Sequence, residues 1–152
     1  MINPSNSPRA LLFRVALLVL LLLATGGLRA ETPISIFLTG ANEVPPVVSS
    51  ATATGQFTVL PDRSLSGSIK ISGMVPTMAH IHEAAVGKNG PPIITLNKSP
   101  DDSYAVPAGA RLSEAQYKSY ATGKLYVNVH SAQYPDGEIR AQLLGKPMRL
   151  AN

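Results

Sequence analysis

Short runs in which apolar and polar residues alternate dominate the chain from residue 34 onward. In the first run, Ile34, Ile36 and Leu38 alternate with serine, phenylalanine and threonine. Alternation with period two is typical of strands that bury one face. Gly, Pro and Asp residues separate the runs, as turns require. The pattern predicts about seven short strands, over 34–40, 51–60, 65–73, 78–84, 93–96, 124–131 and 138–145.

One segment, residues 112–123, has a helical pattern instead. Ser113 and Gln116 form the S-x-x-Q pattern of a capping box, and Gly123 can end the helix. The chain has no long amphipathic helix and no regular internal repeat. We therefore predict an all-β fold, an antiparallel Greek-key sandwich or barrel of about seven strands with one short helix.

Residues 1–30 have a different pattern. Arg9 and Arg14 precede an apolar run over 15–24, and small residues lead to Ala30. This order is typical of a secretory signal peptide. The run is about half of the roughly 20 residues that a membrane-spanning helix needs, so we expect no stable membrane anchor after cleavage. We predict cleavage after Ala30, a single domain over 31–152, and a periplasmic, secreted or cell-surface protein.

The predicted cleavage changes the charge of the protein. Three of the 13 basic residues lie in the first 30 positions, which hold none of the nine acidic residues. Ten basic residues then face nine acidic ones, so no basic patch favours nucleic acid as a partner.

Cysteine is absent from the chain. This excludes disulfides, thiolate metal sites and cysteine catalysis. Glycine-rich nucleotide motifs, a nucleophile elbow and a zincin motif are absent as well. We therefore predict no catalytic residues and no residues that bind an organic cofactor.

All three histidines lie in two of the predicted strands. His80 and His82 share one face of the segment 78–84, whereas Ile81 faces the other way. In 124–131 an apolar core claims Val127 and Val129, which turns His130 outward. If the two strands are neighbours, three imidazoles converge on the outer surface of the barrel.

Three imidazoles without a thiolate suit copper or zinc better than magnesium or calcium. Histidines at i and i+2 have Cα atoms roughly 6.5 Å apart, close enough for both rings to tilt onto one ion. We predict a metal site formed by His80, His82 and His130, with copper favoured and zinc possible. Met78 shares the histidine face, although methionines serve more often in packing than as ligands.

Two other interpretations remain open. The histidines can be hydrogen-bonding residues of a metal-free module that binds or adheres to an extracellular protein partner. Alternatively, copper on three histidines with an open fourth position can support redox catalysis. We favour storage, delivery or sensing of the metal without turnover. Outside the site, we expect Glu43 to fasten its loop, and Glu138 and Arg140 to form a surface pair or hold a neighbouring loop.

Three blocks of sequence carry a resemblance to a known family. They read LTGANEVPPV, AHIHEAAVGKNGPP and LYVNVHSAQYPDGEIRAQLLG, and together they span about residues 35–145. In this order they resemble the CHRD domain, which is named for its repeats in chordin and also occurs as single-domain secreted bacterial proteins. The resemblance implies an extracytoplasmic β-domain of poorly defined function.

A looser resemblance concerns the histidine pair. H-x-H on the outer face of a Greek-key barrel is similar to half of the copper site of Cu/Zn superoxide dismutases. Those enzymes use four copper-ligating histidines and a disulfide, whereas this chain has three histidines and no cysteine. The resemblance therefore implies copper binding more than dismutase activity.

Overall fold

The computed structural model describes residues 32–145, and the predicted signal peptide lies outside this range. Nine strands, one α-helix and one 3-10 helix make up the described part. The strands are β1 (Ile34–Thr39), β2 (Thr52–Val59), β3 (Leu65–Ser72), β4 (Pro76–Glu83), β5 (Pro92–Thr95), β6 (Asn97–Ser99), β7 (Ser103–Ala105), β8 (Leu125–Ser131) and β9 (Ile139–Gln142). The helices are η1 (Gly40–Asn42) and α2 (Glu114–Ala121).

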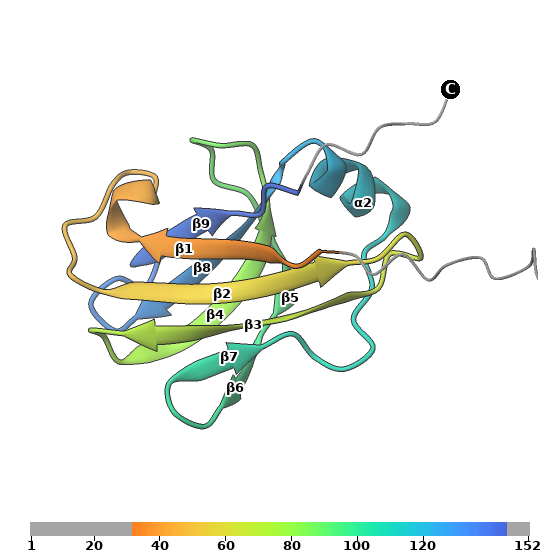
Figure 1. Cartoon of the computed structure of the whole chain (residues 1–152). Coiled ribbons are helices and arrows are strands. Elements are labelled where there is room, and N and C mark those ends of the chain that lie inside the picture. Colours follow the sequence, from red (N-terminus) through yellow and green to blue (C-terminus); the bar gives the residue numbers. More distant parts are fainter. Residues whose placement is uncertain (1–31, 146–152) are drawn as a thin grey trace, which may run out of the picture. The chain divides into compact units, whose positions relative to one another are not determined.

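The nine strands form one antiparallel sheet in the order β5-β4-β8-β9-β1-β2-β3-β7-β6, which curls into an almost closed barrel (Figure 1). Strands distant in sequence are neighbours, since β1 pairs with β9 and β4 pairs with β8. The all-β prediction with one short helix is confirmed. No helix between residues 32 and 145 is long and apolar enough to cross a membrane.

Two strands exceed the predicted seven. β6 and β7 form a hairpin within a segment expected to be a polar connection. Each strand has three residues, too few to show an alternation. Their turn contains Asp101 and Asp102, both with positive φ, which is the geometry of tight hairpin turns.

The helix begins as the capping pattern predicts. The Ser113 hydroxyl accepts the Gln116 N–H at 3.1 Å, and the Gln116 side chain accepts the Ser113 N–H at 2.8 Å. Gly123 has φ +70°, a left-handed conformation that suits glycine after a helix.

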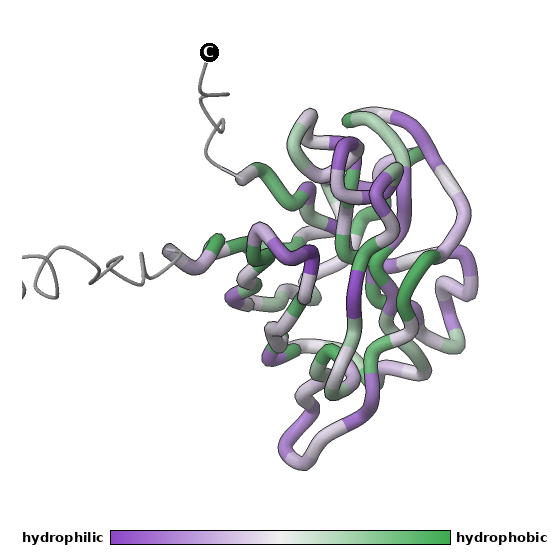
Figure 2. The backbone as a smooth tube through the Cα atoms, turned by 90° about the vertical axis from the view of Figure 1, so that its right-hand side faces the viewer, coloured by the Kyte–Doolittle hydropathy of each residue, from purple (hydrophilic) through white to green (hydrophobic). Residues whose placement is uncertain are grey.

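Hydrophobic and hydrophilic positions alternate along much of the backbone (Figure 2). The apolar positions line the inside of the barrel, where Ala79, Ile81, Val127 and Val129 have no exposed surface. The predicted inward face of these two strands is therefore confirmed.

The outer face of β8 is buried as well as its inner face. Every residue of β8 is buried, including the polar ones, whereas β3 alternates between buried and exposed positions. Segments that follow η1, β4 and β8 in sequence accept hydrogen bonds from side chains on the outer faces of β4, β8 and β9. The covered outer face holds the three histidines.

Candidate metal centre

The pairing of β4 with β8 places the three imidazoles together. His80 lies opposite Asn128, and Met78 lies opposite His130. The His80 and His130 rings therefore meet diagonally, with Nδ1 of His80 3.1 Å from Nε2 of His130. One ring nitrogen of each histidine lies within 4.8 Å of the others.

These separations are close to what one ion requires. Nitrogens that each lie about 2.0–2.1 Å from a tetrahedral ion are about 3.3 Å from one another. The 3.1 Å contact already matches this value. The remaining nitrogens need shifts on the order of 1 Å, which ring rotations supply.

Backbone carbonyls determine which nitrogen of two histidines carries the hydrogen. Nδ1 of His82 lies 2.9 Å from the carbonyl oxygen of Gly90, and Nδ1 of His130 lies 2.8 Å from that of Pro135. A carbonyl oxygen only accepts, so each Nδ1 donates and each Nε2 carries a lone pair. Nε2 of His130 accepts from Nδ1 of His80, whereas Nε2 of His82 has no partner. Histidines that bind metals are oriented in the same way.

Nε2 of His82 is a buried acceptor without a hydrogen-bond partner. Among the buried side-chain nitrogens and oxygens of residues 32–145, this atom and Oδ1 of Asn128 lack a hydrogen-bond partner. Leaving such an acceptor buried and unsatisfied costs about 1–3 kcal/mol. A metal ion at the cluster would satisfy the His82 nitrogen, so the donor set fits copper or zinc.

Burial keeps the imidazoles in the neutral form that a metal requires. It lowers the pKa of His80, His82 and His130 below the ordinary 6.5, because the charged ring is poorly hydrated there. Neighbouring rings lower the pKa of His80 further. All three rings are therefore predominantly neutral at pH 7.

The histidines lie on the outer face of the sheet, as predicted, but not at the surface of the molecule. His82 is 9% exposed and His130 is 7% exposed, while His80 is half-buried. The histidines therefore face outward from the barrel, but the segments that contain Gly90 and Pro135 cover them.

A stack of three side chains supports His82. The Tyr126 ring lies parallel to the His82 ring at 4.8 Å, and the Arg140 guanidinium lies 3.3 Å from the centre of the Tyr126 ring. Arg140 donates to the side-chain oxygen of Asn89 and to the carbonyl oxygen of Lys88. Arg140 thus holds the loop 84–91, whose Gly90 orients His82.

Arg140 and Glu138 do not form the surface pair that was one of the two expectations. Arg140 is 2% exposed and Glu138 is 6% exposed, and the Glu138 carboxylate accepts from the Ser49 hydroxyl. The alternative, that they hold neighbouring loops, agrees with these contacts.

A buried carboxyl contacts Asn128, the residue that lies opposite His80. Glu43 accepts a hydrogen bond of 2.6 Å from the Asn128 side chain, and burial raises the pKa of Glu43 to about 7 despite the positive charge of Arg140. Gly137 leaves room for this pair, since a Cβ atom there would lie 2.4 Å from Nδ2 of Asn128. Sequence reasoning assigned Glu43 to its loop and missed this contact.

Asn128 was also missed as a member of the buried layer. It lies with Tyr126 on the outer face of β8 that carries His130. The alternation along this strand places the three side chains outside the core, but it does not show that loops cover them.

Of the comparisons with known proteins, only the one with family models gives a match. No curated protein and no solved structure matches the chain significantly. The family model described as CHRD domain matches residues 34–143, which include both histidine strands and the covering loops. The chain therefore belongs to the CHRD domain family.

Proposed function

We propose that this domain binds one transition-metal ion, copper in preference to zinc, through His80, His82 and His130. It would store, deliver or sense the ion without catalytic turnover. The observation that carries the proposal is Nε2 of His82, a buried lone pair without a partner whose ring is oriented from the other side by Gly90. Metal binding would supply the missing partner.

The proposal includes export to the periplasm, the medium or the cell surface. The signal-like pattern of residues 1–30 supports export, and membership of the CHRD domain family favours an extracellular setting. In such compartments a metal site made of imidazoles needs no cysteine thiolate, which oxidation would destroy.

A metal-free interaction module with structural histidines is the competing function. The hydrogen bonds from His82 to Gly90 and from His130 to Pro135 fit both functions, since they would also fasten the covering loops. The two functions differ in what a metal does to stability and in what a histidine contributes without metal.

Thermal melts of tag-free protein separate them. Chelator-treated protein should gain about 2.7 kcal/mol when Cu(II) or Zn(II) reaches 100 times its Kd. His80→Ala, His82→Ala and His130→Ala should each remove most of this gain. Gln56→Ala, on the exposed outer face of β2, should keep it.

The competing function predicts a different pattern. The metals would then leave the melting temperature unchanged, and the histidine variants would melt below the parent protein even in chelator. That pattern would replace the metal site with the interaction module.

A further inference from the structure

Met78 is a thioether side chain next to the histidine cluster. It shares the outer face of β4 with His80 and His82, and it lies opposite His130 on β8. Side chains directly opposite on paired strands have Cβ atoms about 4.5–5.5 Å apart. The methionine chain has three rotatable bonds, so its sulfur can lean toward His130 and His80.

The pairing of β4 is irregular at two points near the histidines. Its register with β8 shifts between Pro76 and Met78, and its register with β5 shifts between Ile81 and His82. Such shifts change the direction of side chains and are common next to functional sites. Here one shift directly precedes Met78, and the other lies between His80 and His82.

Exposure increases along this face of β4 toward Met78. His82 is buried, His80 is half-buried and Met78 is 45% exposed. The solvent side of the cluster is therefore the side of Met78. Met74, the neighbouring methionine in sequence, is partly buried and packs against the hydrophobic core.

The position of Arg140 favours an ion of low charge. The three candidate ligands are neutral imidazoles, and the Arg140 guanidinium lies 3.3 Å from the centre of the Tyr126 ring that stacks on His82. A divalent ion would meet more repulsion from Arg140 than a monovalent one, and a buried charge is costly without an opposite partner. Soft thioether ligands also select Cu(I).

We propose that Met78 is the fourth ligand of the site, closing it on the solvent side and making it selective for Cu(I). This inference rests on the proposed function, since it adds a sulfur to the three histidines. The resulting set of three nitrogens and one sulfur binds Cu(I) more tightly than Cu(II) or Zn(II). The occupant is therefore the reduced ion.

Anaerobic competition against bathocuproine disulfonate measures the affinity for Cu(I), and calorimetry measures that for Zn(II) and Cu(II). Met78→Leu should weaken Cu(I) binding at least tenfold and change Zn(II) and Cu(II) binding less than threefold. A tenfold loss for Cu(I) alone lowers the reduction potential of the bound copper by about 59 mV. Met74→Leu is the matched control and should change none of these values.

X-ray absorption of the Cu(I)-loaded protein gives a second readout. The parent protein and Met74→Leu should show a sulfur neighbour of copper, and Met78→Leu should lack it. Met78→Leu should melt with the parent protein in chelator, because the side chain is half exposed. A changed affinity would then report on ligation, not on folding.

Two outcomes would overturn the inference, and they are distinguishable. If Met78→Leu binds Cu(I) like the parent while His82→Ala loses all three metals, Met78 is not a ligand but the histidine site stands. If the parent protein binds no metal at all, the proposed function fails and this inference fails with it.

Discussion

The half of the sheet around β2 and β3 and the half around β8 and β9 share one hydrophobic core. They differ on their outer faces. On β2 and β3 the outer face carries exposed residues such as Thr54, Gln56 and Lys70. On β8 the corresponding Tyr126 and Asn128 are each 3% exposed. A fold that needs only a core gains little by burying polar side chains outside it, because each requires a partner. The covered half is therefore where function is expected.

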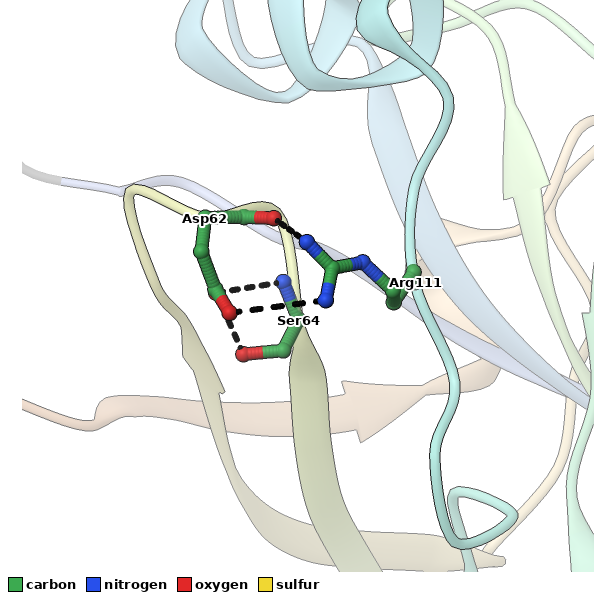
Figure 3. Close-up of polar contacts among 3 residues, drawn as sticks. All are labelled: Asp62, Ser64 and Arg111. Carbon is green, nitrogen blue, oxygen red and sulfur yellow. Dashed lines mark hydrogen bonds and ion pairs between the residues drawn. The ribbon is translucent and has the colours of Figure 1, made fainter.

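Two arginines, one exposed and one buried, illustrate the difference between the two outer faces. Arg111 lies at the surface with its side chain 55% exposed, and it donates to the backbone oxygen of Asp62 and pairs with the Asp62 carboxylate at 3.6 Å (Figure 3). Ser64 also donates to this carboxylate through its backbone and its hydroxyl. Such an exposed pair contributes little to stability, because water screens its charges. Arg140 instead lies buried against Tyr126 and holds the loop over the histidines.

The largest expected effect is a loss of stability from a substitution on the buried inner face. The same kind of substitution on the exposed outer face should have almost no effect. Val127→Asp places a charge without a partner in the core, so it should lower the free energy of unfolding by about 4 kcal/mol or more. Ser68→Asp, on the exposed face of β3, should change it by less than about 0.5 kcal/mol. Urea unfolding measures both. Equal losses would mean that the facing of these strands is wrong.

The second-largest expected loss of stability comes from replacing Arg140, and replacing Arg111 provides the comparison. Arg140→Ala removes the stack on Tyr126 and two hydrogen bonds to the loop 84–91, so it should cost about 3 kcal/mol. Arg111→Ala should cost less than about 1 kcal/mol.

Hydrogen exchange gives this comparison a second readout. Arg140→Ala should speed amide exchange of Gly90, whose N–H lies 3.2 Å from the Tyr126 hydroxyl, and Arg111→Ala should not. Unchanged exchange in the Arg140 variant would show that other contacts hold the loop.

The third expected effect depends on pH. Burial raises the pKa of Glu43 from 4.5 to about 7, so its contribution to stability is present below pH 4.5 and is lost as pH rises through 7. Glu43→Gln keeps an oxygen for Asn128 but cannot ionise. The variant should therefore be more stable than the parent at pH 8, by about 3 kcal/mol, and by less than about 1 kcal/mol at pH 5.

Denaturant melts of both proteins at the two pH values provide the comparison. An Asp62→Asn variant is the surface control, since the Asp62 pKa is lowered, not raised, by the Ser64 hydrogen bonds. If Glu43→Gln were destabilising by the same amount at pH 5 and pH 8, ionisation of Glu43 would play no part.

Features that depend on neighbouring residues in the sequence could be predicted, whereas features that depend on contacts between distant residues could not. The alternation around Ile81 and Val127 and the capping pattern at Ser113 are local, and the structure agrees with all three. The burial of the histidines was not predicted, because it depends on contacts such as that between Arg140 and Lys88, 52 residues apart. Alternation shows which face a side chain occupies, but not whether a distant loop covers that face.

The metal site itself is tested most directly by calorimetric titration of tag-free, chelator-treated protein with Cu(II) and Zn(II). We predict one saturable site per chain with Kd below about 10 μM, a value that corresponds to about −7 kcal/mol. Because burial lowers the pKa of all three histidines, binding should persist at pH 6.5 and weaken only at lower pH, as protons compete for the rings. The absence of any saturable site tighter than about 10 μM for either metal, and for Cu(I) in the anaerobic competition, would contradict the account and leave the histidines as structural residues.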